Sequence, residues 1–234
     1  MTGWLALVGG AEFRRGCEQA DRVLLDAIGG AGVRVAILPT AAAAEGAPHM
    51  AAANGVKHFK RLGADASGVM VVDRVTANDP SLAAQLAAAQ LVYIAGGDPG
   101  YLLRSLKASL AWRAMLEAWR RGAVLAGSSA GAMVLCETMW NPSTKRIEPA
   151  LSLVGRALVI PHHRPGSEWA RQVTTELGGD HTLLGIAEET ALIWDGAAWQ
   201  VQGPGEVTVY SRGELTSHSS GEAFQLDGVK VDGE

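Results

Sequence analysis

The chain has 234 residues, of which 48% are hydrophobic and 19% are charged, and its formal net charge is −4. This length fits a single α/β domain over residues 1–234, with a core large enough to need no disulfides. Lys and Arg are scattered rather than clustered, which argues against nucleic acid as a partner. Glycine accounts for 29 of the 234 residues, a share of about 12% against a typical ~7%, which predicts many tight turns.

Cysteine content and hydropathy narrow the class of protein further. Cys17 and Cys136 lack the number and spacing of a disulfide framework or zinc site, so both are expected to be reduced and buried. The longest uncharged stretch, 80–97, is interrupted by glutamines and glycines and predicts a helix followed by a strand, not a membrane span. Residues 1–10 have no basic start, so we expect a cytoplasmic protein with no membrane partner.

Short apolar runs alternate with longer helical segments over the first two-thirds of the chain. This pattern is typical of a mostly parallel, doubly wound sheet with helices on both faces. The predicted strands are 4–8, 33–38, 68–72, 91–95 and 123–126, and the predicted helices are 18–28, 48–62, 80–89, 99–107, 110–121 and 130–136. Ligands of such folds bind beyond the carboxyl ends of the strands, where this chain places small and turn-forming residues.

The pattern changes after residue 138. A strand at 156–160, a helix at 167–177 and a strand at 183–187 are followed by an antiparallel hairpin region. Its first two strands, 191–195 and 198–202, flank Asp195-Gly196, which predicts a type I′ turn. A third antiparallel strand is expected at 206–210. No linker separates this region, so it extends the same domain.

The segment Gly127-Ser128-Ser129-Ala130-Gly131 lies between a predicted strand and a predicted helix. This is G-x-S-x-G in the context that lifts a serine above the sheet and places a helix N-terminus behind it, ready to stabilise an oxyanion. The segment therefore predicts a nucleophilic serine. The alternative is a turn of small residues in which Ser128 is an ordinary helix N-cap.

A nucleophilic serine needs a base and a group that orients the base. His162 and His163 directly follow a predicted strand, and Glu188 and Glu189 directly follow another, so both pairs are expected at the functional edge. Side chains alternate along a strand, so only one residue of each pair can face the site. The alternative for the two carboxylates is a solvated acidic loop.

Five motifs occur in the order seen in cyanophycinase and peptidase E (aspartyl dipeptidase). They are Leu7-Val-Gly-Gly-Ala-Glu12, Ile37-Leu-Pro-Thr40, Ala95-Gly-Gly-Asp98, Gly127-Ser-Ser-Ala-Gly131 and Gly185-Ile-Ala-Glu-Glu-Thr-Ala191. The chain resembles this family of serine peptidases over roughly residues 4–195. The resemblance implies a fold similar to class I glutamine amidotransferase domains and a small peptide substrate.

The resemblance also implies catalytic roles. Ser129 would be the nucleophile, His163 the general base and Glu188 the acid that orients it, with Glu189 as the fallback. If His163 faces the site, His162 points away; an exchange of these two roles is the alternative.

The same resemblance implies an oxyanion hole formed by the backbone N–H groups of Gly97 and Ala130. Asp98 would shape the loop that presents Gly97 and belongs to the expected substrate-binding region. The sequence carries no dinucleotide, ATP or metal-binding motif, so no cofactor and no metal are expected.

The sequence departs from the cyanophycinase pattern around the proposed base. Pro161 and His162 replace a polar Asp-Gln pair, and Pro99 replaces a Gln, which argues against cyanophycin as the substrate. Aspartyl dipeptidases need a cation for a substrate carboxylate, and Arg164 is the candidate here, with an ordinary exposed arginine as the alternative.

Two other functional classes compete with a peptidase. An α/β-hydrolase esterase would place its acid before its histidine, which here would require Asp195 and His218. A non-catalytic binding protein would keep the pocket without the chemistry. The seven tryptophans are expected to be core residues or contacts of a homodimer.

Overall fold

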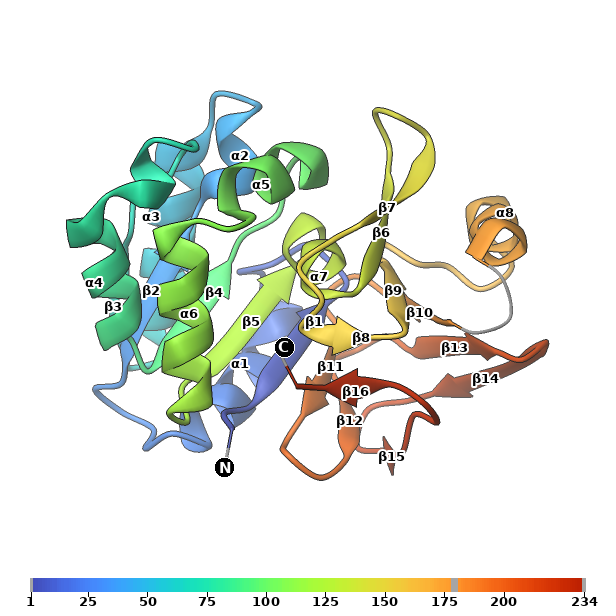
Figure 1. Ribbon diagram of the computed structural model, residues 1–234. Helices are drawn as coiled ribbons and strands as arrows, with labels where there is room; N and C mark the ends of the chain where they lie inside the picture. The colour runs from blue at the N-terminus through green and yellow to red at the C-terminus, as the bar shows by residue number, and fades with distance from the viewer. Residues whose placement is uncertain (1, 178–180, 233–234) are drawn as a thin grey trace.

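Two β-sheets that lie next to each other organise the fold (Figure 1). The computed structural model describes residues 2–177 and 181–232. The larger sheet has eight strands in the order β15-β12-β11-β1-β5-β4-β2-β3. Five strands run parallel to one another: β1 (Leu5–Val8), β2 (Arg34–Leu38), β3 (Asp65–Gly68), β4 (Leu91–Ile94) and β5 (Val124–Ser128). Antiparallel pairing adds β11 (Ala191–Trp194), β12 (Trp199–Gln202) and β15 (Ala223–Phe224).

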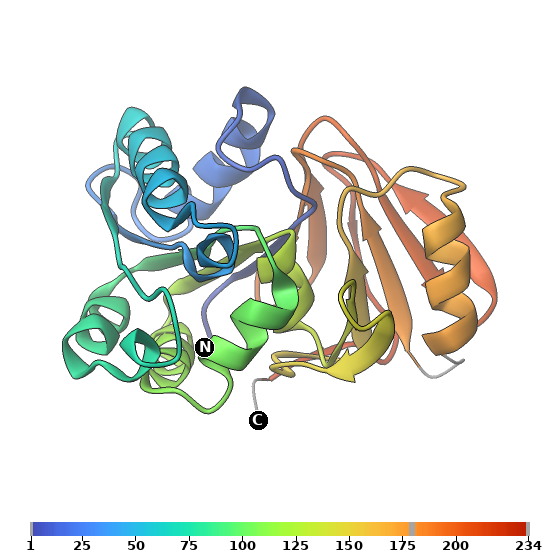
Figure 2. The same ribbon diagram turned by 90° about the horizontal axis from the view of Figure 1, so that it is seen from above.

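Helices cover both faces of the central sheet, as predicted, because alternate side chains of its strands enter two hydrophobic layers. In β1, Ala6 and Val8 belong to the layer that contains Leu24 and Phe59, whereas Leu7 belongs to the opposite layer. The first layer is covered by α1 (Glu18–Asp26) and α3 (Pro48–Arg61), blue and cyan in Figure 2. The opposite layer is covered by α4 (Pro80–Ala88), α5 (Pro99–Leu106), α6 (Leu110–Arg120) and α7 (Ala130–Leu135).

The second sheet has four strands in the order β14-β13-β10-β9. They are β9 (Ala157–Ile160), β10 (Thr182–Ile186), β13 (Val207–Ser211) and β14 (Glu214–His218), and α8 (Glu168–Leu177) packs on this sheet through Ala170 and Val173. The strand expected at 206–210 is therefore present, but it pairs with β10 and β14 instead of continuing the hairpin of β11 and β12.

Shorter elements complete the described chain. The helix α2 (Thr40–Ala43) follows β2, and single 3-10 turns occur at Arg15–Cys17 and Thr76–Asn78. Two small antiparallel pairs escaped prediction: β6 (Thr138–Asn141) with β7 (Arg146–Pro149), and β8 (Val154–Gly155) with β16 (Lys230–Val231).

Two local predictions were wrong. The strand β3 ends at Gly68, where the predicted strand 68–72 begins. The hairpin after β11 turns through Asp195, whose carboxylate accepts hydrogen bonds from the N–H groups of Ala197 and Ala198, both at 2.8 Å. Only Gly196 in this turn has a positive φ, +97°, so the turn is not the predicted type I′, which needs positive φ at both central residues.

Within residues 2–177 and 181–232, no helix combines the length and apolar character needed to cross a bilayer.

Candidate active site

Ser129 occupies a sharp turn between β5 and α7. Its backbone has φ +49° and ψ −110°, a conformation that costs free energy for a residue with a side chain. The glycines on either side allow the turn: a Cβ on Gly127 would lie 2.5 Å from the carbonyl carbon of Gly131, and one on Gly131 would lie 2.6 Å from the carbonyl oxygen of Ile94. The turn is held to the sheet by a hydrogen bond from the N–H of Ser129 to the carbonyl oxygen of Val8, at 2.9 Å.

The side chain of Ser129 contacts His162. Ser129 Oγ lies 3.0 Å from His162 Nε2, and His162 Nδ1 lies 2.9 Å from Oε1 of Glu188. With Glu188 ionised, Nδ1–H donates to the carboxylate, which leaves Nε2 to accept a hydrogen bond from the serine hydroxyl. Three residues from separate segments are thus joined in a continuous hydrogen-bonded chain.

The structure corrects the predicted position of His163. This residue is only 4% exposed and lies on the second sheet, against Gly185 and with Nε2 3.3 Å from the hydroxyl of Tyr210. The prediction assumed that side chains alternate from face to face as far as His163. The strand β9 already ends at Ile160, and the positive φ of His162, 52°, turns the chain before His163. The structure instead shows the alternative arrangement, in which His162 contacts Ser129 and His163 does not.

Burial lowers the pKa of His163 below its ordinary value. A folded-state pKa below the unfolded-state pKa means that the unfolded chain binds more protons in acid, so this residue lowers stability as pH falls below about 6.5. We expect the free energy of unfolding to fall less between pH 8 and pH 5 in His163→Gln than in the wild type. Urea unfolding followed by tryptophan fluorescence at the two pH values measures the difference; equal pH dependence in both proteins would contradict it.

Gly10 makes room for the ring of His162. A Cβ on Gly10 would lie 2.2 Å from Cε1 of His162, and Gly10 also has a positive φ of 116°. The neighbouring Gly9 accepts a hydrogen bond from the N–H of His162, at 2.7 Å. The loop after β1 therefore determines where the imidazole lies.

Substitution of Gly10 tests this arrangement. In Gly10→Ala the new methyl group displaces the ring of His162, and we expect the rate of reaction at Ser129 to fall by about 100-fold. The matched control is Gly213→Ala, at a glycine with a similarly positive φ of 81° and open space around the Cβ position. The rate of labelling by a fluorophosphonate is the readout, and equal rates in the two variants would refute the displacement.

Glu188 and Glu189 diverge after β10. Glu188 faces His162, whereas Glu189 has a positive φ of 56° and accepts a hydrogen bond from the N–H of Gly16 at 2.8 Å through Oε2. The hydrogen bond from His162, followed by the charges of His162, Arg14 and Arg164, lowers the pKa of Glu188 below its usual value. The carboxylate of Glu188 is therefore ionised at neutral pH.

Gly97 lies in the loop between β4 and α5, and Ala130 directly follows Ser129. Gly97 has φ +141°, and a Cβ there would come 2.4 Å from the backbone of Ala41, so only glycine fits. Ala130 is the first residue of α7, and the N–H of a first helical residue has no acceptor within its own helix. Asp98 caps α5, accepting a hydrogen bond from the N–H of Tyr101 at 2.6 Å. Its carboxylate thus shapes the loop that carries Gly97.

Sequence reasoning missed Glu12. Its Oε1 accepts a hydrogen bond from the N–H of Gly96 at 2.7 Å, and its Oε2 accepts one from the hydroxyl of Ser128 at 2.8 Å. Both partners are far away in sequence, so no local spacing revealed the contact. The only available signal was the position of Glu12 in the first of the five ordered motifs.

The alternative acid and histidine of an esterase arrangement lie elsewhere. Asp195 is bound in the turn between β11 and β12, and His218 pairs with Glu222 at 3.2 Å and stacks on Phe224. Ser129 contacts His162 instead, so the geometry does not support the esterase reading.

Cys17 and Cys136 are free and buried, as predicted, and burial raises the pKa of each thiol to about 12. Both thiols are therefore protonated at neutral pH. Residues 2–177 and 181–232 contain no cluster of three or more His, Cys, Asp or Glu side chains that could hold a metal ion.

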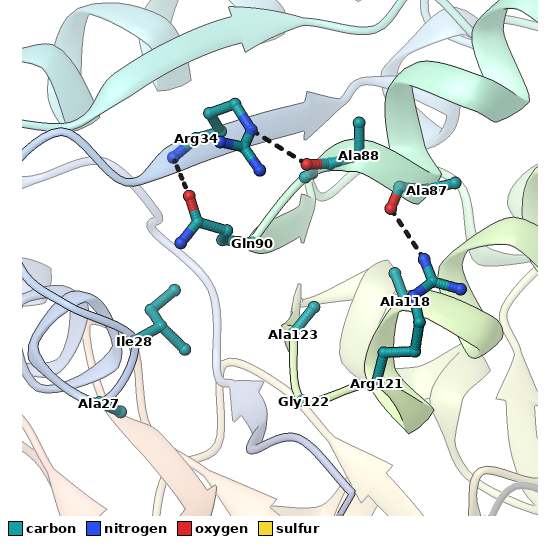
Figure 3. Close-up of a pocket in the computed structure, with 11 residues that line it drawn as sticks. Ala27, Ile28, Arg34, Ala87, Ala88, Gln90, Ala118, Arg121, Gly122 and Ala123 are labelled. Atoms are coloured by element: carbon teal, nitrogen blue, oxygen red, sulfur yellow. Dashed lines mark hydrogen bonds between the residues drawn. The ribbon is translucent and has the colours of Figure 1, made fainter.

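A cavity of about 540 Å³ lies at the amino-terminal ends of β2, β4 and β5, whereas Ser129 follows the carboxyl end of β5 (Figure 3). Its lining includes Arg34, the first residue of β2, and Gln90 and Ala123, which directly precede β4 and β5. Two of its arginines have structural roles: Arg34 donates to the carbonyl oxygen of Ala88, and Arg121 donates to that of Ala87. Both bonds satisfy carbonyl groups at the C-terminus of α4, which have no partner in the helix itself.

The serine turn, the histidine and the carboxylate together have the arrangement of a serine hydrolase on an α/β sheet. The family model of peptidase family S51 matches residues 5–201. The chain belongs to peptidase family S51, a family of serine peptidases.

Solved structures have the same fold. A peptidase from an acI-B1 Actinobacterium is 29% identical, with a TM-score of 0.86 over 97% of this chain and 98% of that one. A candidate peptidase E from Listeria monocytogenes EGD-e is 19% identical, with a TM-score of 0.65 over 88% of this chain and 100% of that one. The search of curated proteins gives no match.

Proposed function

We propose that this serine peptidase cleaves a peptide or isopeptide bond of a small acidic substrate through an acyl-enzyme on Ser129, with His162 as general base and Glu188 as its orienting acid. The observation that carries the proposal is the hydrogen-bonded chain from Ser129 Oγ through His162 to Glu188, with distances of 3.0 and 2.9 Å. The exposure of about half of both the His162 and Glu188 side chains leaves the group open to a substrate.

In the first half of the reaction, His162 Nε2 takes the hydroxyl proton as Ser129 Oγ attacks the carbonyl carbon. The N–H groups of Gly97 and Ala130 are the donors proposed to stabilise the oxyanion that develops. When the C–N bond breaks, His162 passes its proton to the departing amine. The ionised Glu188 stabilises the imidazolium in between.

The second half regenerates the enzyme. His162 removes a proton from a water molecule, which attacks the acyl carbon, and the ester bond to Ser129 breaks as Oγ regains a proton from His162. The products are a carboxylic acid and an amine, and the reaction needs no oxidant, reductant or metal.

A preference for an acidic substrate is supported by the charges beside the site. Arg164 is exposed and its charge helps to lower the pKa of Glu188, as does that of Arg14, which sequence reasoning did not single out. A substrate carboxylate near Glu188 would need such cations to offset the repulsion. A panel of Asp-X, β-aspartyl and neutral dipeptides, assayed with wild type and Arg164→Ala, tests this: KM should rise for the acidic members only.

Covalent labelling tests the nucleophile without knowledge of the substrate. A fluorophosphonate probe should form one adduct, mapped to Ser129 by peptide mass spectrometry, and Ser129→Ala should give none. Ser128→Ala separates the two adjacent serines, since its adduct should still form at Ser129. A folded wild-type protein that forms no adduct would favour the non-catalytic binding protein.

A further inference from the structure

We propose that Glu12 is a positioning residue. It fixes the turn that carries Ser129 and the loop that carries Gly97 relative to each other. This inference rests on the proposed function of Ser129. Glu12 follows β1, whereas its two partners follow β4 and lie at the end of β5. A single carboxylate thus links the loops after β1 and β4 to the last residue of β5 at the carboxyl edge of the sheet.

The two hydrogen bonds match the chemistry of a carboxylate. An ionised carboxylate only accepts hydrogen bonds, and here each oxygen faces one donor: the N–H of Gly96 at 2.7 Å and the hydroxyl of Ser128 at 2.8 Å. Hydrogen bonds to an ionised acceptor are about twice as strong as neutral ones. Ser128 is fully buried, so its hydroxyl has no competing water partner.

Both partners of Glu12 are next to proposed catalytic groups. Ser128 precedes the nucleophile, and Gly96 precedes the proposed oxyanion donor Gly97. Gly97 is held on its other side as well, since the N–H of Asp98 donates to the carbonyl oxygen of Ala41 at 3.1 Å. The peptide that carries the N–H of Gly97 is therefore fixed between two anchored neighbours.

Close packing adds to the argument. A Cβ on Gly96 would lie 3.1 Å from Oε1 of Glu12 and 3.3 Å from Cβ of Ser129, so Gly96 fills the space between the carboxylate and the nucleophile. A shift of the Gly96 loop would change the distance between the oxyanion donor and Ser129. Glu12 touches neither the hydroxyl of Ser129 nor His162 through the contacts described, so it acts through the backbone of these loops.

The pair Glu12→Ala and Glu12→Gln tests the inference. In Glu12→Gln the amide oxygen can accept from Gly96 while the NH₂ group donates to Ser128, which turns its hydroxyl. Both links then survive without the charge. We expect fluorophosphonate labelling of Ser129 to slow by about 10- to 100-fold in Glu12→Ala and by less than about threefold in Glu12→Gln. The matched control is Glu18→Ala, which removes a nearby carboxylate that pairs with Arg61.

Two further measurements separate positioning from folding and from failure of the proposed function. All variants should keep wild-type melting temperatures within a few degrees, and amide hydrogen exchange in the peptide around Gly96 should speed up in Glu12→Ala alone. Wild-type labelling rates in Glu12→Ala, or equal slowing in both Glu12 variants, would overturn the inference. A wild type that does not label would refute the proposed function instead, and the exchange of the Gly96 peptide would still decide whether Glu12 holds that loop.

Discussion

Replacement of His162 by glutamine is expected to lower kcat/KM by several orders of magnitude, since loss of a general base removes the proton acceptor of the serine. The same substitution at His163 should cost less than about tenfold, because His163 is buried against Tyr210 on the second sheet and does not contact Ser129. The two variants carry the same change at adjacent positions in the sequence, so they differ only in where the lost imidazole lies in the structure.

The assay for this pair is hydrolysis of the best dipeptide from the acidic panel, together with fluorophosphonate labelling. Added imidazole should restore part of the activity of a His162→Gly variant, because the ring is about half exposed and its removal leaves an accessible space. A severe loss in His163→Gln, at a melting temperature close to that of the wild type, would reverse the assignment of the base.

Glu188→Gln is expected to reduce kcat by about 10²- to 10⁴-fold, with a smaller change in KM. Glutamine has no charge to stabilise the imidazolium, and its NH₂ group can bind Nδ1 and so favour the wrong tautomer of His162. Glu189→Gln is the matched control: Glu189 does not contact His162, and the amide oxygen of glutamine can still accept the hydrogen bond from the N–H of Gly16, so the chemistry should change little.

Single-turnover acylation by an ester substrate measures the Glu188 effect on the chemical step. Wild type and Glu189→Gln should differ by less than about tenfold, whereas Glu188→Gln should acylate far more slowly. A larger defect in Glu189→Gln would restore Glu189 as the orienting acid.

The fold was predictable wherever local patterns determine structure. The parallel strands β1, β2, β4 and β5 are largely buried apolar runs, and they begin and end within two residues of the predicted bounds. The strand β3 has the sequence Asp-Ala-Ser-Gly and is mostly not buried, so it lacks this signal. The small pair of β6 and β7 was missed because its strands alternate weakly: β7 has only half-buried and exposed residues. The sheet to which β13 belongs was also missed, because pairing between distant strands leaves no local signal.

The candidate site was predictable in its residue types and only partly in its geometry. The turn at Ser129 could be predicted from G-x-S-x-G, because the two glycines of this motif lie at the positions where the turn leaves no room for a side chain. The choice between His162 and His163 depends on a single positive φ just after β9, which the sequence of that segment does not specify. Glu12 was missed for a different reason, since its contacts join residues more than 80 positions apart.

The division of the site between two sheets has a consequence for how substrate preference can change. Ser129 follows β5 of the central sheet, whereas His162, Glu188 and Arg164 come from loops of the second sheet. The backbone bonds from His162 to Gly9 and from Glu189 to Gly10 lock the two parts together at one dipeptide. As long as these bonds persist, exposed side chains between β9 and α8 other than His162, such as that of Arg164, can change without moving the imidazole of His162. New contacts to substrate can therefore arise on this segment while the hydrogen-bonded chain from Ser129 to Glu188 stays in place.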